Sequence, residues 1–458
     1  METLPHDILC DIFLRSLPNR FDRVNIPFKA SISAPLYISH ACRAWRSLAL
    51  SCGELWSYLC IHYALMSRNG RRMVVDILDT WLSRSNGSPI SYVFLCSLSE
   101  KDDIEDHRRA EYMIKTLLSQ QHRWKDVNFT WFNVNFSNEF PGLDVTNMPM
   151  LTSLFFYVLS MHATISLAQS SRLRSLDVRG SFDLSVVGEP LGILNRCEFT
   201  FLSAFGFTGD RAVRISLDVL KNAPFLTRFV AYFSPHMALS NRLDDHSRLL
   251  LRSLRTLKLE HGEAPAAIVD NVTLPSLEAF YYGSRVREGI LFNFFQRSRP
   301  PLTFLAVGGP CAGEDEIFGI LRLLPCLKTL RYSNTIVSKR FFNELAVGIG
   351  EIGEDTSSVE RATCPKLEIL RLHNLFPLDS VSECIEALIL MMRTRARIQK
   401  SFENIRLDGG NAGSVEINTS DIDDYTEVLL QCFEDRKGHL VVGDYDNAFR
   451  KSFPPNSD

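Results

Sequence analysis

Apolar residues recur along most of the chain in sets of three, in which the second position follows the first by three residues and the third follows two residues later. The eleven sets are Trp124/Val127/Phe129, Leu151/Leu154/Phe156, Leu173/Leu176/Val178, Leu202/Phe205/Phe207, Leu226/Phe229/Ala231, Leu254/Leu257/Leu259, Leu277/Phe280/Tyr282, Leu302/Leu305/Val307, Leu327/Leu330/Tyr332, Leu367/Leu370/Leu372 and Phe402/Ile405/Leu407. We expect each set to form one strand. In the sixth set, the pattern predicts that Leu254, Leu257 and Leu259 point inward and that Arg255 and Lys258 tolerate alanine.

Two further signals recur in phase with these sets. Proline stands two residues before the first position in six repeats, at Pro149, Pro224, Pro275, Pro300, Pro325 and Pro365. Glycine or asparagine stands seven residues after the first apolar position of six sets, at Gly180, Gly209, Gly309, Asn334, Asn374 and Gly409. Proline ends a helix, and glycine and asparagine tolerate the turn that ends a strand. Helix-like segments at 216–222, 314–324, 340–347 and 380–395 lie between the sets, so the pattern predicts an α/β fold with a parallel sheet and helices outside it.

The first sixty residues have a different, helical pattern. Leu4, Ile8, Leu9, Ile12 and Phe13 have the spacing of one helix face, and Pro5 stands where a helix begins. The prolines of the following connection are Pro18, Pro27 and Pro35, and they predict that no second helix begins before Tyr37. A second helix is expected over 38–49, with an apolar face made of Ile38, Cys42, Trp45 and Ala49.

Three short motifs in this segment are similar to those of a known family. Leu-Pro-x-Asp-Ile-Leu-x-x-Ile-Phe from Leu4, Ser-His-x-Cys-Arg-x-Trp-Arg-x-Leu-Ala from Ser39, and Leu-Trp-Ser from Leu55 together resemble an F-box of the fungal type. The resemblance covers about 60 of the 458 residues. It implies that Leu4, Pro5, Ile8, Leu9 and Ile12 contact the Skp-family adaptor of a cullin-RING ubiquitin ligase. The alternative is that Leu4, Ile8, Ile12, Trp45 and Trp56 are only the core of a small helical cap.

The chain departs from the F-box pattern in two places. The connection between the first two helices is long, and Cys52-Gly53 stands where a proline often precedes Leu-Trp. The later sets resemble the irregular leucine-rich repeats of F-box proteins, although they lack the asparagine or cysteine that usually follows the first position by eight residues. The resemblance therefore implies a small F-box followed by an irregular leucine-rich-repeat solenoid.

The predicted order is an F-box domain at 1–62, a helical linker with one strand at 63–121, a leucine-rich-repeat-like array at 122–410, and a C-terminal cap and tail at 411–458. In the linker, 66–84 has helical spacing and 90–95 reads as a strand. The acidic run 99–107 opens a helix that extends to about residue 121, because acids stabilise the positive end of a helix. This role is favoured over metal binding.

Composition and charge exclude several classes of protein. Fifty Lys and Arg face fifty-three Asp and Glu, so the net charge of −3 gives no field that attracts nucleic acid or an anionic membrane. No apolar run approaches the roughly 20 residues that span a bilayer. The eleven cysteines form no C-x-x-C pair and predict free thiols in a reducing compartment. A cytoplasmic or nuclear location is expected.

One motif imitates a cofactor site. Residues 348–353 match G-x-G-x-x-G, but a helix precedes them and Glu351, Glu354 and Asp355 would repel a pyrophosphate. The eleven histidines have no spacing that specifies a nucleophile site. We therefore expect no cofactor, no metal and no catalytic residue, so the chain should not itself be an enzyme.

These observations favour a substrate-recognition subunit of an SCF-type ubiquitin ligase, which binds a Skp-family adaptor, and through it a cullin, and a protein substrate. The alternative is a non-ligase leucine-rich-repeat scaffold or interaction protein. In the last three sets the residue between the second and third positions is Arg331, Arg371 and Arg406. These arginines are either neutralised by Asp408, Glu368 or Glu403, solvated by water, or used to bind an acidic or phosphorylated peptide.

Overall fold

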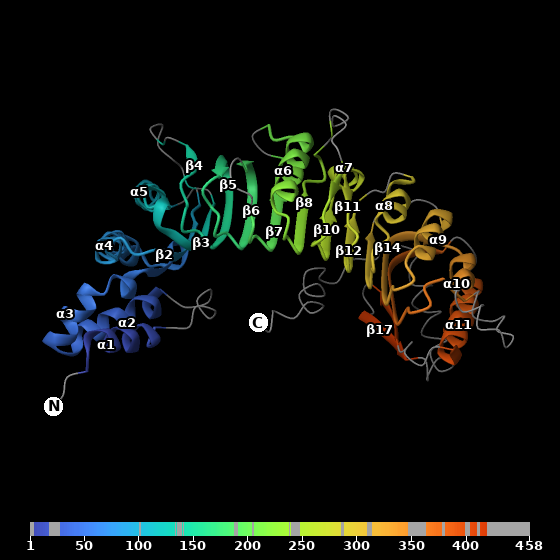
Figure 1. The fold of residues 1–458 in the computed structure, drawn as a ribbon, viewed down its shortest axis with the longest axis horizontal. Coiled ribbons are helices and arrows are strands. Elements are labelled where there is room, and N and C mark those ends of the chain that lie inside the picture. The colour runs from blue at the N-terminus through green and yellow to red at the C-terminus, as the bar shows by residue number, and fades with distance from the viewer. Residues whose placement is uncertain are drawn as a thin grey trace. The chain divides into compact units, whose positions relative to one another are not determined.

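The computed structural model describes most of the chain. The described residues are 4–17, 28–99, 102–132, 134, 140, 142–186, 191–203, 206–237, 239, 248–284, 288–308, 314–346, 363–377, 381–398, 404–409 and 413–418. The chain divides into two compact units, Met1–Met237 and Ala238–Asp458. Both units combine parallel strands with helices, so the α/β class is confirmed (Figure 1).

Unit 1 opens with helices and continues as a sheet. Its helices are α1 (His6–Arg15), α2 (Phe28–Ala41), α3 (Arg43–Ser51), α4 (Arg68–Arg84), α5 (Ile104–Ser119) and α6 (Gly209–Asn222), with short turns η2 (Gly53–Trp56), η3 (Tyr63–Leu65) and η4 (Gln121–Arg123). The predicted helices at the N-terminus, at 66–84 and after the acidic run are confirmed as α1, α4 and α5. Asp103 caps α5 by accepting a hydrogen bond from the Glu105 N–H, as expected of an acidic helix start.

The prediction that no second helix begins before Tyr37 was wrong. Helix α2 spans Phe28–Ala41 and contains Pro35 in its interior. It ends where Cys42 adopts an extended conformation and its thiol accepts a hydrogen bond from the Trp45 N–H at 3.4 Å. The single helix expected over 38–49 is therefore the end of α2 followed by α3.

The strands of unit 1 form one parallel sheet. They are β1 (Tyr58–His62), β2 (Ile90–Ser97), β3 (Trp124–Phe132), β4 (Leu143–Val145), β5 (Ser153–Ser166), β6 (Ser175–Ser185), β7 (Arg196–Phe201) and β8 (Arg228–Phe233). Their order is β1-β2-β3-β5-β6-β7-β8, and β4 pairs with β5. Leu59 is in register with Tyr92 on β2, and Tyr92 with Val127 on β3. The sheet therefore begins well before residue 122, where the sequence placed the start of the array.

One repeat was assigned to the wrong residues. The sequence placed a strand on Leu202/Phe205/Phe207, but the strand is β7, in which Cys197 and Phe199 are buried. Leu194, Cys197 and Phe199 have the same spacing of three and two, so the pattern was present eight residues earlier. Cysteine occupies the middle position, and a small thiol is a weaker apolar signal than leucine.

Unit 2 repeats strand and helix in alternation. Its strands are β9 (Leu249–Leu250), β10 (Thr256–Glu260), β11 (Val272–Thr273), β12 (Ala279–Gly283), β13 (Phe304–Gly308), β14 (Thr329–Val337), β15 (Ile369–Pro377), β16 (Asn404–Gly409) and β17 (Gly413–Asn418). Its helices are α7 (Ala264–Asn271), α8 (Ile290–Ser298), α9 (Glu314–Arg322), α10 (Lys339–Ala346) and α11 (Val381–Ile398). The main sheet runs β10-β12-β13-β14-β15-β16-β17, and its last pair is antiparallel. Sequence analysis missed α7 and α8.

The helices of unit 2 pack on the inward positions that the pattern predicted. Leu257, Phe280, Leu305 and Leu330 lie in register on neighbouring strands, and all four are buried. The Phe280 ring lies 5.4 Å from the ring of Phe294 on α8. The inward direction of Leu254, Leu257 and Leu259 is thus confirmed, and the alternate residues of each strand face away from the helices.

The predicted strand ends were correct in only some repeats. Strand β16 ends at Gly409, as expected. Strands β6, β14 and β15 continue beyond Gly180, Asn334 and Asn374, where the sequence predicted turns. Gly180 does not end the strand. Glycine is needed there because φ is +133° and a Cβ would clash with the Val158 carbonyl oxygen.

Candidate functional site

Helix α1 presents an apolar stripe to solvent. Leu4, Ile8 and Ile12 follow one another at intervals of four residues, and they are 51 %, 48 % and 47 % exposed. Ile8 and Ile12 lie on one face of α1, and Leu4 directly precedes its N-cap residue. Pro5 occupies the N-cap position beside them and is exposed, and Leu9 is half-buried. We call Leu4, Ile8 and Ile12 the α1 stripe, and all five residues predicted to bind an adaptor lie on it or next to it.

The α1 stripe is exposed because α1 meets the rest of the helical cap through its other side. Phe13 is buried, and its ring centroid lies 5.0 Å from that of Trp45 on α3. Trp56 is also buried, and its indole N–H donates to the Ala49 carbonyl oxygen at 2.8 Å. Of the residues in the alternative, Trp56 lies in the core, whereas Trp45 is 39 % exposed. The alternative fails for the α1 stripe.

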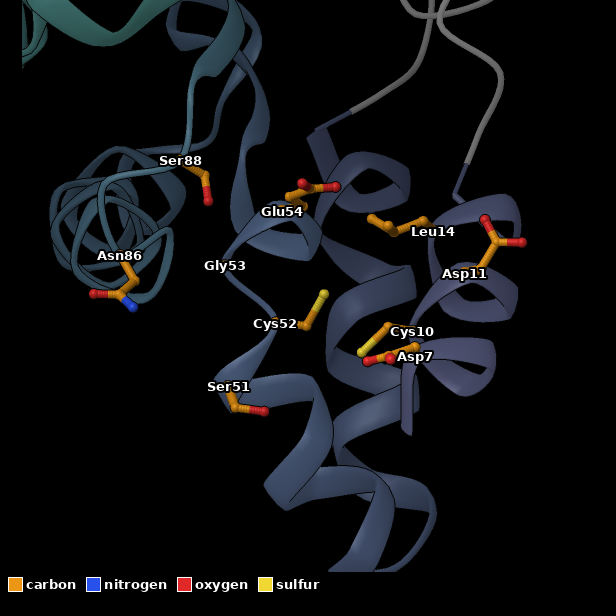
Figure 2. Close-up of a pocket in the computed structure, with 10 residues that line it drawn as sticks. All are labelled: Asp7, Cys10, Asp11, Leu14, Ser51, Cys52, Gly53, Glu54, Asn86 and Ser88. Atoms are coloured by element: carbon orange, nitrogen blue, oxygen red, sulfur yellow. The ribbon is translucent and has the colours of Figure 1, made fainter. Parts of the chain in front are cut away.

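A pocket of about 480 Å³ lies on another face of α1 (Figure 2). Its lining residues are Asp7, Cys10, Asp11, Leu14, Ser51, Cys52, Gly53, Glu54, Asn86 and Ser88. Burial raises the pKa of the Cys10 thiol to about 11, and the neighbouring Cys52 adds to this effect. The thiol is therefore protonated at neutral pH, and a protonated thiol is a poor nucleophile.

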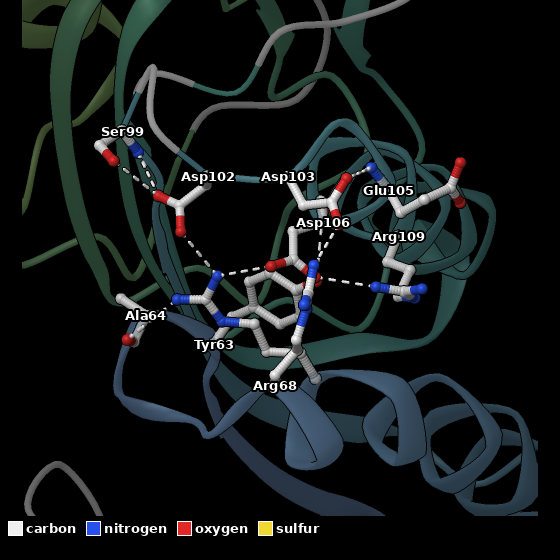
Figure 3. Close-up of polar contacts among 10 residues, drawn as sticks. Tyr63, Ala64, Arg68, Ser99, Asp102, Asp103, Glu105, Asp106 and Arg109 are labelled. Atoms are coloured by element: carbon white, nitrogen blue, oxygen red, sulfur yellow. Dashed lines mark hydrogen bonds and ion pairs between the residues drawn. The ribbon is translucent and has the colours of Figure 1, made fainter.

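A network of buried charges fastens α4 to the start of α5 (Figure 3). The Asp106 carboxylate accepts hydrogen bonds from Arg71 and Arg109, both at 2.8 Å, and the Tyr63 hydroxyl donates to the Asp106 carbonyl oxygen at 3.2 Å. Arg71 also donates to Asp102 at 2.9 Å. The hydrogen bond from Arg71 lowers the pKa of Asp102 to about 2, and the Ser99 backbone N–H lowers it further. The acidic run thus caps a helix and also joins two elements that flank β2.

Tryptophan residues connect the helical cap to the sheet of unit 1. The rings of Trp56 on η2 and Trp81 on α4 lie 4.8 Å apart, and the Arg84 guanidinium lies 4.4 Å from the Trp56 ring. The Trp81 indole N–H donates to the Tyr58 carbonyl oxygen of β1 at 3.2 Å. Helix α2 also packs on β1. The cap and the first strands therefore form one packed body.

The sheet of unit 2 brings the three predicted arginines into one column. Arg331 is in register with Arg371, and Arg371 with Arg406. The same column continues to Ala306, Tyr281 and Lys258 on the preceding strands. At the other end, Glu416 of β17 lies opposite Arg406. We call the positions of Lys258, Arg331, Arg371 and Arg406 the basic column.

Two positions of the basic column are buried. Lys258 is 1 % exposed and Arg331 is 8 % exposed, although the pattern placed Lys258 among residues that tolerate alanine. Lys258 forms an ion pair of 3.2 Å with Glu260, which is also buried. The burial of Lys258 and Arg331 depends on contacts with residues distant in sequence. The alternation of apolar and polar residues along one strand does not predict such contacts.

Of the three acids expected to neutralise the arginines, only Glu368 has a described side chain. Glu368 pairs with Lys328 at 2.9 Å, and Asp408 lies in register with His373. Glu403 lies outside the described residues. Glu416 was missed, because it belongs to a strand that the apolar sets did not predict. The register places its backbone opposite that of Arg406.

The sheet of unit 1 carries a second charged group that sequence analysis missed. Arg179 donates two hydrogen bonds of 2.9 Å to Asp177 and forms an ion pair of 3.2 Å with Glu198. Its guanidinium lies 5.0 Å from the Phe155 ring. Burial raises the pKa of Asp177, and the hydrogen bonds from Arg179 oppose that rise. Asp177 stands between the second and third apolar positions of its set, which is the same position that the arginines hold in unit 2.

One constellation resembles a hydrolytic triad in its chemistry. His162 lies 3.0 Å from the Ser181 hydroxyl through Nδ1 and 3.2 Å from Asp183 through Nε2. Ser181 is only 3 % exposed, and Asp183 also pairs with Arg211. A buried hydroxyl cannot reach a substrate. The contacts instead hold the register shift between β5 and β6 at His162.

Comparisons with known proteins give no assignment. No family model matches the chain, and no curated protein matches it. Within the described ranges, no helix has both the length and the apolar character to cross a membrane. Over the same ranges, no three or more His, Cys, Asp and Glu side chains are grouped to hold a metal ion. The segment 348–353 with its G-x-G-x-x-G match lies outside the described residues.

Proposed function

We propose that the chain is the substrate receptor of an SCF-type, cullin-RING ubiquitin ligase. In this proposal the first 62 residues are an F-box, and the sheet belongs to an irregular leucine-rich-repeat solenoid. The α1 stripe, with Pro5 and Leu9, binds a Skp-family adaptor. The observation that carries the proposal is that these apolar residues remain exposed beside a complete core.

The size of the α1 stripe sets what it can contribute. Full burial of an Ile or Leu side chain is worth about 1.5 to 3 kcal/mol. An adaptor that covers the exposed half of one such side chain therefore gains about 1 kcal/mol of binding free energy. Three such side chains give about 3 kcal/mol, whereas a micromolar complex needs about 8 kcal/mol. The adaptor must therefore contact more of the cap, where Tyr37 and Leu50 are also exposed.

The connection between cap and sheet supports a receptor that acts by proximity. A ligase receptor raises the local concentration of substrate near the ubiquitin-carrying enzyme and supplies no catalytic group. This mechanism works best when the docking helix keeps a fixed relation to the strands that follow it. The contacts of Arg71 with Asp106 and of Trp56 with Trp81 provide such a relation within unit 1.

The basic column is the proposed substrate site in unit 2. Arginine binds carboxylate and phosphate through two parallel hydrogen bonds. Three arginine positions lie on adjacent strands that are about 4.8 Å apart, so one acidic segment that crosses these strands can meet more than one of them. An acidic or phosphorylated protein segment is the substrate class that fits Arg331, Arg371 and Arg406.

Calorimetry with a purified Skp-family adaptor tests the docking role. Replacing Leu4, Ile8 and Ile12 together by alanine should weaken binding roughly hundredfold, which is the loss of about 3 kcal/mol estimated above. The thermal melt should not change, since all three residues are half-exposed. The matched control replaces Leu65 and Met73, which are exposed apolar residues outside the stripe.

Undiminished binding by the triple variant would contradict the assignment of the α1 stripe. If the folded, unaltered chain bound no Skp-family adaptor, the alternative of a non-ligase leucine-rich-repeat scaffold would replace the proposal.

A further inference from the structure

In unit 2, the sheet face opposite the helices is as buried as a core. Lys258, Tyr281, Ala306 and Arg331 form one column on β10, β12, β13 and β14, and the middle two are 5 % and 8 % exposed. In the described part of unit 2, the contacts of α8 and α10 involve the other face, through Phe280 and Tyr332. We call the face that carries Lys258 and Arg331 the open face.

The open face combines an apolar centre with basic ends. Ala279, Tyr281, Phe304 and Ala306 form the centre, and the rings of Tyr281 and Phe304 lie 4.5 Å apart. Lys258 lies on one side of this centre, and the arginine positions of the basic column lie on the other side. Such a surface suits a segment that carries both acidic and apolar residues.

The chain itself contains such a segment directly after the last strand. Residues 421–435 include six acids and no Lys or Arg, and the acids are Asp421, Asp423, Asp424, Glu427, Glu434 and Asp435. Apolar residues lie among them, namely Tyr425, Val428, Leu429, Leu430 and Phe433. Six strand spacings separate β17 from β10, or about 29 Å. Fifteen residues can extend about 50 Å, so the segment is long enough to cross the face.

We infer that the acidic segment 421–435 binds the open face of unit 2 and occupies the site proposed above for an acidic substrate. The inference that the segment regulates substrate binding rests on that proposed function. A substrate must displace the segment, and the acids of the segment compete for the same arginines that a substrate carboxylate or phosphate would use.

Because the acidic segment is covalently linked to the open face, the strength of its competition with a substrate can be estimated. A short linker gives an effective concentration of about 1 mM. If the segment binds with a dissociation constant of about 10 µM as a separate peptide, the linked segment weakens any competitor roughly hundredfold. An anionic peptide added in solution should therefore bind the unaltered chain poorly.

A labelled synthetic peptide of residues 419–436 tests the inference by fluorescence anisotropy against the full chain. Changing Asp421, Asp423 and Asp424 together to lysine should release the face. This variant should then bind the peptide at least tenfold more tightly than the unaltered chain does, and the affinity should fall steeply with salt. The matched control changes Asp444, Asp446 and Asp458 to lysine, which alters the net charge equally, and it should bind like the unaltered chain.

Arg331→Gln and Arg371→Gln, added to the released variant, should abolish peptide binding while the thermal melt shows a folded chain. Should this variant fail to fold, Arg371→Gln alone should still reduce the affinity at least threefold. Equal peptide affinity in the unaltered chain and the released variant would overturn the inference, as would peptide binding that ignores both arginines. No adaptor takes part in this assay, so its failure is distinct from failure of adaptor docking at the α1 stripe.

Discussion

Arg71 donates a hydrogen bond of 2.8 Å to the carboxylate of Asp106, although 35 residues separate them in the sequence. Their side chains are 13 % and 6 % exposed. The pair joins α4, which precedes β2, to α5, which follows it. A charge pair removed from water stabilises its surroundings only while both partners are present, because either partner alone would be a buried, uncompensated charge.

Arg71→Ala should lower the free energy of unfolding by about 3 kcal/mol, the lower end of the cost of breaking a buried ion pair, because Asp106 keeps Arg109. Chemical denaturation followed by circular dichroism measures this loss. The control is Arg108→Ala, which removes an exposed pair with Glu105 and should cost less than about 1 kcal/mol. Similar losses in both variants would mean that the network does not hold α4 to α5.

The same network should make stability depend on pH. The pKa of Asp102 is lowered from 3.8 to about 2 by its hydrogen bonds from Arg71 and Ser99. Its ionised form is therefore favoured in the folded state, so its contribution is complete above about pH 4 and is lost as the pH falls toward 2. Asp102→Asn should lower the melting temperature at pH 7, and the difference from the unaltered chain should shrink below pH 4. A difference that grew on acidification would have the wrong sign.

The parts of the fold that could be predicted are those fixed by local periodicity. Leu257, Leu330 and Leu370 were placed correctly because alternation along a strand decides which residues face the helices. The α1 stripe was found because residues four apart share a helix face. The register of Arg331 with Arg371 could be predicted because both residues stand between the second and third apolar positions of their sets. Equivalent positions of neighbouring sets pair on adjacent strands.

The parts that could not be predicted depend on contacts distant in sequence. Pro35 was taken to exclude a helix, whereas it lies inside α2, which packs on β1. Lys258 was expected to tolerate alanine, whereas it is buried together with Glu260, its partner in an ion pair. His162, Ser181 and Asp183 met only because a register shift in β5 brings them together. The spacing of residues along the sequence does not predict such long-range contacts.

Gly53 explains one departure from the F-box pattern. A Cβ at this position would lie 2.6 Å from the Ser85 carbonyl oxygen, at the end of α4, and 2.9 Å from the Ser88 hydroxyl. Gly53→Ala should therefore destabilise the chain by about 1 to 3 kcal/mol, as overpacking does. Gly70→Ala in α4 meets only ordinary contacts and should stabilise by up to about 1 kcal/mol. Opposite shifts of the melting temperature in the two variants would confirm that η2 needs glycine to approach α4.

The two faces of β10 can be separated by three substitutions measured in the same denaturation assay. Leu257→Ala should cost about 2 to 5 kcal/mol, because it opens a cavity against the helices. Arg255→Ala should cost less than about 1 kcal/mol, since its ion pair with Glu278 is exposed. Lys258→Ala should cost about 3 kcal/mol, because Glu260 would keep a buried charge without its lysine. Lys258→Met with Glu260→Leu should recover most of that loss, since apolar residues of similar volume often replace a buried ion pair without cost. If Lys258→Ala were as harmless as Arg255→Ala, the open face would be solvated and the burial of the basic column would be wrong.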